Sequence, residues 1–434
     1  MQVFCVNIIN KYKQTGIINL KIKKMLVGIS IKNYALLQEL KLGLDPKKLE
    51  RTTQVAQLKE FDSLQQFTVL IGPNDSGKTT VFEALEFVSN LLKRDAQIAA
   101  NKSKQGSFYE LMTSYVRNGA VLEFDLVFKH FELSCYLRYL VMIAADHNYR
   151  PFVKKELVQQ ITVDSCEINK ITLLDIEQGQ GYIQIPTSSD PESKTEFEVQ
   201  TDLSSQRETV QLTERKISAL SIYGRMQQYQ ILVWLYQKMT RFYFAQLNKL
   251  PNQTSKNIQI GGHKHLNRNA TNIENFLSYL RSENPKQYKS LLKRLNDNLP
   301  SGNKIDLTAS DSIIGAGNLK LLILYLILAD RRPIIALDQP DAGLYYEMIN
   351  ALLIELRDYS IRNPESQIFI STHSANMLDA FAPEEVWSFD RTVDADNQPQ
   401  ITARYIENNP VIKAMYQEGV GLGSLWYSGY FENV

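Results

Sequence analysis

The two ends of the chain carry short apolar runs that are followed by amphipathic stretches. The run at 67–71, "FTVLI", precedes a glycine-rich turn and then a helical pattern with one apolar face, which contains Val81, Leu85 and Val88. Towards the other end, the segments 332–340 and 366–374 each contain a short apolar run of the kind that forms a buried strand. An amphipathic helical pattern separates these two segments. We therefore expect strands and helices to alternate at both ends.

The middle of the chain shows two different patterns. Over 120–205, apolar and polar runs alternate, as in "AVLEFDLVF", which predicts antiparallel strands that continue the sheet of the N-terminal half. Residues 186–196 are polar and rich in turn formers, so we expect a loop there. From 213 to 250 the pattern is helical, and its aromatic residues are dense: Tyr223, Tyr229, Trp234, Tyr236, Phe242, Tyr243 and Phe244. These helices either pack on the rest of the protein or form an exposed arm that meets a partner, and they are too short for a long coiled coil.

Composition narrows the class of protein. The 434 residues are 44% hydrophobic and 22% charged, which fits two domains or one large domain with insertions. The net charge of +1 gives no general case for binding nucleic acid or membranes, and no apolar run reaches the roughly 18 residues of a membrane span. Residues 1–24 are expected to be a leader outside the fold, which leaves Met1 or Met25 as the true start. The cysteines lack metal-site spacing, and we expect free thiols in a reducing cytoplasm: Cys5, Cys135 and Cys166.

The strongest chemical signal is the loop 72–79, "GPNDSGKT", which matches the phosphate-loop pattern G-x-x-x-x-G-K-[ST] at every fixed position. Glycines let the backbone wrap a phosphate, and the N-terminus of the following helix favours an anion. Lys78 would reach the β- and γ-phosphates, the Thr79 hydroxyl would hold magnesium, and Thr80 would support the phosphates. The sequence therefore predicts ATP and Mg²⁺ as ligands of these residues: Gly72, Asn74, Ser76, Gly77, Lys78, Thr79 and Thr80.

Further candidate residues stand more than two hundred positions later. Asp338 ends an apolar strand, as a magnesium-supporting aspartate does, and Gln339 follows it directly. His373 ends the next apolar strand, which favours a role near the γ-phosphate. A glycine turn opens the apolar helix upstream, and it is either an anion site at a helix N-terminus or a simple helix cap: Gly315, Gly317 and Asn318.

Together these segments resemble the ABC-type ATPase heads of the SMC, RecF and OLD-like group, and in particular the stand-alone bacterial AAA-type ATPases of defence or DNA-repair systems. The resemblance covers roughly 25–140 and 265–434, including the ending "GVGLGSLWYSGYFENV". It implies an α/β P-loop NTPase head with a mixed central sheet flanked by helices, an antiparallel β-subdomain and an inserted, largely helical arm. The halves of the head would be 25–140 and 266–434, and the insertion 141–265.

The same resemblance assigns roles to single residues. Gly315 to Asn318 take the place of the signature loop, Asp341 to Leu344 match the D-loop, and His373 matches the switch histidine. In such heads, two subunits enclose two ATP molecules, and the signature loop of one closes on the γ-phosphate held by the other. The resemblance thus implies a homodimer or a higher homo-oligomer that forms through ATP.

Two positions depart from the family pattern. Gly315 stands where a serine is usual, and Gln339 stands where the family has the glutamate that polarises the attacking water. An amide can hold water but cannot take its proton, so we expect slow hydrolysis, and whether the chain is a working ATP hydrolase is left open. A natural loss, a laboratory substitution or a substitute carboxylate such as Asp341 would each explain Gln339.

The favoured function is an ATP-gated dimerising switch. The relatives imply a role in phage defence with a separate nuclease or toxin as effector, or the sensing of DNA. The alternative is a turnover ATPase in DNA repair or recombination. The polar segment 252–269 either touches DNA phosphates through Lys264 and Arg268 or is a solvated loop, and His263 and His265 lack further metal ligands.

Overall fold

The computed structural model describes residues 25–54, 57, 62–112, 121–163, 167–185, 206–247, 265–299, 315–393 and 399–431. The expected leader 1–24, the polar loop 186–196 and most of the segment 252–269, with His263 and Lys264, lie outside the described residues. Within the described ranges, no helix is long and apolar enough to span a bilayer.

The phosphate loop, Asp338 and His373 lie at the ends of strands that belong to one six-stranded sheet. Its strand order is β10-β11-β12-β3-β13-β14, and all neighbours are parallel except the last pair. The strands β11, β12 and β3 are buried along their whole length, as expected for parallel strands that helices cover on both faces. The bounds are β3 (Phe67–Ile71), β10 (Tyr243–Gln246), β11 (Ile334–Asp338), β12 (Gln367–Ser371), β13 (Val386–Val393) and β14 (Pro399–Tyr405).

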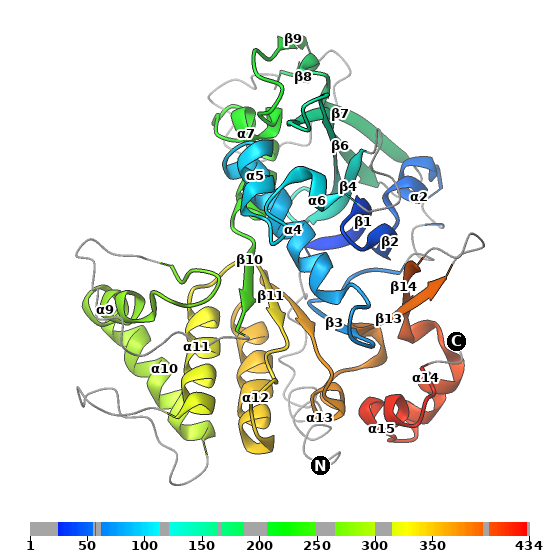
Figure 1. Cartoon of the computed structure of the whole chain (residues 1–434). Coiled ribbons are helices and arrows are strands. Elements are labelled where there is room, and N and C mark those ends of the chain that lie inside the picture. The colour runs from blue at the N-terminus through cyan, green and yellow to red at the C-terminus, as the bar shows by residue number, and fades with distance from the viewer. Residues whose placement is uncertain are drawn as a thin grey trace.

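The second sheet has eight strands, all antiparallel, in the order β2-β1-β4-β5-β6-β7-β8-β9. The antiparallel strands expected within 120–205 are confirmed here, and they extend the hairpin of β1 and β2 (Figure 1). The bounds are β1 (Leu26–Tyr34), β2 (Leu37–Gly43), β4 (Leu122–His130), β5 (Cys135–Ala145), β6 (Pro151–Val163), β7 (Ile168–Glu177), β8 (Gln180–Gln184) and β9 (Arg207–Gln211). The expected mixed central sheet with an antiparallel β-subdomain is thereby confirmed.

Helix α4 (Lys78–Lys93) lies between the two sheets. On one side, Phe82 packs edge-on against Phe244 of β10, with ring centroids 5.7 Å apart. On the other side, Phe87 stacks on Phe124 of β4 at 5.5 Å. The helix therefore joins both sheets in one hydrophobic core, which α5 (Ala96–Lys102), α6 (Phe108–Leu111), α7 (Ala219–Tyr223) and α8 (Gln230–Thr240) complete.

A second core lies on the other face of the six-stranded sheet (Figure 1). Its central helix is α11 (Ala316–Ala329), which is buried from Leu319 to Leu328, as its apolar sequence requires. Helices α9 (Ile273–Glu283), α10 (Pro285–Asn298) and α12 (Tyr346–Arg362) pack around it. The C-terminal part contributes α13 (Ala375–Leu378), α14 (Pro410–Gln417) and α15 (Leu422–Tyr427). The short helices α2 (Pro46–Arg51), η2 (Pro383–Glu385) and η3 (Ile406–Asn408) complete the described elements.

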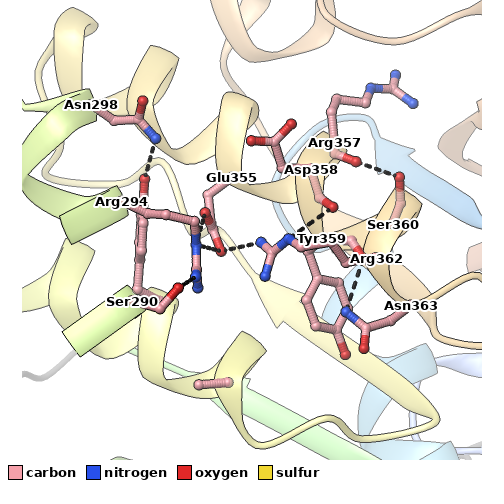
Figure 2. A network of polar contacts seen from close by, with 12 residues as sticks. Ser290, Arg294, Asn298, Glu355, Arg357, Asp358, Tyr359, Ser360, Arg362 and Asn363 are labelled. Carbon is pink, nitrogen blue, oxygen red and sulfur yellow. Dashed lines mark hydrogen bonds and ion pairs between the residues drawn. The ribbon is translucent and has the colours of Figure 1, made fainter. Parts of the chain in front are cut away.

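A closed ion network fastens α10 to α12 (Figure 2). The Glu355 side chain is 1% exposed, and its two oxygens accept hydrogen bonds from Arg294 Nε at 3.1 Å and Arg362 Nη2 at 2.7 Å. Arg294 Nη1 also donates to Ser290 Oγ at 2.8 Å. Both guanidinium groups flank one carboxylate, so the buried negative charge is compensated.

The helical pattern expected over 213–250 needs correction. Helices α7 and α8 cover only part of it, and residues 243–246 form the edge strand β10. A four-residue apolar run has the same pattern in a buried strand and in a buried helix, which explains the error. The helices pack on α4, with Leu232 and Leu235 buried, so the packed arrangement is confirmed over the exposed arm. In the described part of 141–265, more residues lie in strands than in helices, so this region is not a largely helical arm.

Candidate nucleotide site

The loop between β3 and α4 adopts a conformation that needs its glycines. Gly72 has φ +139, and a Cβ there would lie 2.2 Å from the carbonyl oxygen of Phe389 on β13. Gly77 has φ +87 and caps the N-terminus of α4. Only glycine adopts such backbone angles freely, so the loop can turn its backbone into the N-terminus of α4. Residues 73–75 are exposed, which leaves this turn open to a ligand.

Lys78 is 5% exposed and folds back over its own loop. Its Nζ donates to the carbonyl oxygens of Gly72 at 3.0 Å and Pro73 at 2.6 Å, and to Ser76 Oγ at 3.2 Å. Burial lowers the pKa of Lys78 to about 8. Its positive charge is thus held by neutral groups, and it stands beside a helix N-terminus that also favours an anion.

Asp338 closes the site from the neighbouring strands. Its Oδ1 accepts hydrogen bonds from Thr79 Oγ1 at 2.9 Å and from Ser371 Oγ at 2.6 Å. The register of β11 and β12 pairs Asp338 with Ser371 directly. A hydroxyl and a carboxylate side by side are oxygen ligands of the kind Mg²⁺ prefers, so the donor set of Thr79 and Asp338 fits that ion.

His373 follows β12 at the same edge of the sheet as Asp338. Its Nε2 is buried and has no hydrogen-bond partner among the residues that the structure describes. Burial, and next the charge of Lys78, lower the pKa of His373, so the neutral imidazole is favoured. A buried nitrogen without a described partner is compatible with a contact to a ligand or a water molecule.

Gln339 has an unusual backbone. Its φ of +47 lies in the left-handed region, and its N–H donates to Ser371 O at 3.1 Å and to Ser371 Oγ at 3.0 Å. These bonds hold the chain where it leaves the strand, directly after Asp338. The half-buried side chain that the site presents here is an amide and not a carboxylate.

Asp341, two positions after Gln339, is the next carboxylate along the chain. Asp341 is 9% exposed, and its Oδ1 accepts a hydrogen bond from Thr372 Oγ1 at 2.9 Å. Burial raises the pKa of Asp341. Asp341 is therefore held in place by the residue that precedes His373.

The glycine turn lies against the segment that follows Asp338. Gly315 is exposed and caps α11, and a Cβ on Gly317 would lie 2.9 Å from the sulfur of Met348. Lys320 Nζ donates to the carbonyl oxygens of Gln339, at 3.2 Å, and of Ala342. The turn is thus tied to its own D-loop-like segment, which fixes its place in the fold.

The same turn has no described link to the phosphate loop. None of the hydrogen bonds of the described residues joins the two. The Asn318 Oδ1 atom is buried without a hydrogen-bond partner in the described part of the chain. The structure therefore brings together the phosphate loop, Asp338 and His373, and it places the glycine turn beside them without completing a contact.

The sequence did not single out Ser371 or Gln246, which the structure places at the site. Ser371 orients Asp338, and Gln246 at the end of β10 pairs with Asp338 in the parallel register. The apolar run 366–371 that ends in a serine was the signal for the first. Gln246 was not identified because the segment that forms β10 was predicted to be part of a helix.

Arg268 was expected either to contact DNA phosphates or to lie in a solvated loop, and the structure supports neither. Its side chain is 25% exposed and pairs with Glu86 at 2.8 Å. His265, in the same segment, instead contacts Asp330 through Nδ1 at 2.5 Å. Both residues therefore belong to interactions within the fold.

Solved structures similar to the chain include an SMC head bound to the C-terminal winged-helix domain of ScpA, with TM-score 0.43 and 10% identity over 88% of this chain and 98% of that one. The SMC head domain of Thermotoga maritima gives TM-score 0.40 and 10% identity over 87% and 97%. An SMC head with an extended coiled coil, bound to the C-terminal domain of ScpA, from Pyrococcus furiosus, gives 0.40 and 10% over 91% and 99%.

The search among curated proteins finds no match. Residues 25–378 match the AAA ATPase domain family. This range spans the eight-stranded sheet, four strands of the six-stranded sheet (β3, β10, β11 and β12), the phosphate loop, Asp338 and His373. The chain belongs to the AAA ATPase domain family.

Proposed function

We propose that the protein binds ATP with Mg²⁺ and acts as an ATP-gated dimerising switch that hydrolyses the nucleotide slowly. The observation that carries the proposal is the juxtaposition of a complete phosphate loop, through Thr79, with Asp338 at 2.9 Å, while the next residue is Gln339. The phosphate loop, Lys78, Thr79 and Asp338 supply the kinds of group that hold phosphates and Mg²⁺, which supports the proposal. The residue suited to take a proton from water is missing.

Each residue has a defined part in holding the nucleotide. The backbone of 72–79 and Lys78 would bind the phosphates, and Thr79 and Asp338 would hold Mg²⁺. Bound Mg²⁺ supplies charge neutralisation of the phosphate oxygens. The Nε2 of His373, which has no hydrogen-bond partner among the described residues, can donate a hydrogen bond to a terminal phosphate oxygen when the proton resides on that nitrogen.

The glycine turn supports the dimerisation part of the proposal. Gly315 is exposed and the described contacts of the turn lead to its own D-loop-like segment, so its helix N-terminus can serve a nucleotide held by a second copy. ATP would then form the contact between two heads, and slow hydrolysis would keep them closed. Closure would create or hide a surface for DNA or for a separate effector such as a nuclease or toxin in phage defence, as the family resemblance suggests.

The test compares the wild-type chain with Gln339→Glu. We expect the variant to hydrolyse ATP faster by roughly 10²–10⁴-fold, since a general base contributes an effect of that size. Mass photometry with ATP should show long-lived dimers for the wild type and shorter-lived dimers for Gln339→Glu. Lys78→Ala sets the background of both measurements. Equal, rapid hydrolysis by wild type and Gln339→Glu would overturn slow turnover, and dimers that ignore ATP would overturn the switch.

A turnover ATPase in DNA repair is the alternative, and it depends on Asp341. This carboxylate lies near His373, and its raised pKa brings it closer to the range of a base. Hydrolysis by the wild type that DNA stimulates, and that Asp341→Asn removes without loss of ATP binding, would favour the alternative.

A further inference from the structure

Arg268 joins the phosphate-loop helix to the strand beside Asp338. Its Nη1 contacts Glu86 Oε2 of α4 at 2.8 Å, and its Nη2 donates to Gln246 Oε1 of β10 at 3.1 Å. The guanidinium carbon lies 4.3 Å from the centre of the Phe244 ring. The carbonyl oxygen of Arg268 also accepts a hydrogen bond from the N–H of Gln246 at 3.4 Å. Gln246 is therefore held through both its backbone and its side chain.

The sheet register places Gln246 at the nucleotide site. Gln246 pairs with Asp338 across the parallel strands β10 and β11. Side chains alternate along a strand, and Phe244 packs on Phe82 of α4, so Gln246 shares the face towards α4. Asp338 lies on that face too, because its carboxylate reaches Thr79 of α4. The Gln246 side chain thus neighbours the pair of oxygen ligands that suits Mg²⁺.

Arg268 also determines which end of the Gln246 amide is available. A guanidinium only donates hydrogen bonds, so the atom that faces it must be the amide oxygen. The amide nitrogen, a donor, is then left for another acceptor. Oxygen atoms of a phosphate or of a water beside Thr79 and Asp338 are acceptors of the required kind.

The charge of Arg268 is matched to buried carboxylates on α4. Glu83 is 6% exposed, and its Oε1 lies 4.0 Å from Arg268 Nη2. Burial raises the pKa of Glu83 and of Glu86, and the positive charge of Arg268 opposes that shift in both. Arg268 therefore interacts with the carboxylates of Glu83 and Glu86 on α4 and with the side-chain amide of Gln246 on β10. A lysine ammonium group lacks the planar, forked set of donors of a guanidinium, so it could not make the same contacts.

We propose that Arg268 is a positioning residue of the nucleotide site, which holds Gln246 so that its amide nitrogen is presented beside Asp338 and Thr79. The proposal rests on the Mg²⁺-ATP binding proposed above, but not on dimerisation or slow hydrolysis. Arg268 acts through Gln246 and does not itself touch the ligand.

The experiment measures binding of a fluorescent ATP analogue to the full chain while Mg²⁺ is titrated, together with the melting temperature. Arg268→Ala and Gln246→Ala should each raise the Mg²⁺ concentration for half-maximal binding about tenfold, the size typical of residues that orient metal ligands. The double variant should shift the midpoint no further than the larger single effect, because both changes remove one interaction. Arg268→Lys should restore most of the melting temperature and leave the Mg²⁺ midpoint shifted.

Arg294→Ala is the matched control, because the Arg294 side chain is 27% exposed and pairs with a glutamate as Arg268 does, but on α10. It should lower the melting temperature and leave the Mg²⁺ midpoint at the wild-type value. Effects of Arg268→Ala and Gln246→Ala that multiply, a midpoint unchanged by Arg268→Ala, or a midpoint restored by Arg268→Lys would each overturn the proposal. A wild-type chain that binds Mg²⁺-ATP but stays monomeric would overturn only the switch, whereas one that binds no Mg²⁺-ATP would overturn both.

Discussion

Two polar clusters of the molecule are built from similar groups, but they differ in whether their buried polar groups have partners within the fold. In the network of Figure 2, the Glu355 carboxylate accepts from two arginines, so its buried negative charge is compensated within the fold. In the nucleotide site, Lys78 is buried over neutral carbonyl oxygens, and His373 Nε2 has no partner among the described residues. Stability requires that buried charges are compensated, whereas binding requires that some compensation is left to the ligand.

The comparison separates two kinds of buried polar residue. Removing a member of the closed network should cost stability, and removing a member of the open site should cost ligand affinity. The two clusters lie on different faces of the six-stranded sheet, because α10 and α12 belong to the second core while α4 lies in the first. Their effects should therefore be nearly independent.

Lys78→Ala should have the largest effect. It removes charge-assisted hydrogen bonds to the phosphates, so the dissociation constant for Mg²⁺-ATP should rise by at least about 100-fold, which isothermal titration calorimetry can measure. The melting temperature should stay the same or rise slightly, since burial of the ammonium group is unfavourable without a ligand. Lys93→Ala, at the other end of α4, is the control. Unchanged affinity in Lys78→Ala would contradict the assignment of the site.

Glu355→Gln should have the opposite profile. The amide cannot compensate both arginines, so we expect the free energy of unfolding to fall by about 1–3 kcal/mol in urea denaturation. ATP affinity should not change. Glu347→Gln, an exposed glutamate on the same helix, should alter neither quantity. A weakened ATP affinity in Glu355→Gln would show that the two clusters are coupled.

For a change of one pH unit, the pH dependence should give the smallest effect. The pKa of Lys78 is about 8 in the ligand-free fold, below its usual value of about 10.4, so Lys78 loses its charge above pH 8. ATP affinity should then fall with rising pH, approaching about tenfold per pH unit. The contribution of Lys78 to stability should change in the opposite direction, because between pH 8 and 10 the unfolded chain binds this proton more strongly than the fold does.

Binding and unfolding measured from pH 7 to 10, for the wild type and Lys78→Met, would reveal both trends. The stability difference between the two proteins should diminish as the pH rises. A wild-type affinity that is constant over this range would refute the depressed pKa of Lys78.

Local patterns were sufficient to predict the parts of the site that lie where a strand ends. The phosphate loop, Asp338 and His373 each follow a short apolar run, and the structure places all of them at one edge of one sheet. The eight-stranded antiparallel sheet was also predictable, because its strands alternate between apolar and polar residues.

The contributions of β10 and Arg268 were not predictable from local patterns. A run such as "YFAQ" carries no periodicity that separates a strand from a helix, so Gln246 could not be placed. The pairing of Arg268 with Glu86 joins residues 182 positions apart, and a basic residue in a polar segment has the same appearance whether it is solvated or paired. Partners of that kind are fixed by tertiary packing alone.

The hydrogen bond between Thr79 and Asp338 joins residues 259 positions apart along the chain. During synthesis at roughly 5–20 residues per second, the phosphate loop leaves the ribosome tens of seconds before its aspartate partner does. An interrupted translation product would contain the loop without the strand that completes it. Capture of Mg²⁺-ATP would therefore distinguish a chain translated past Asp338 from a shorter fragment, and the nucleotide could stabilise only the former.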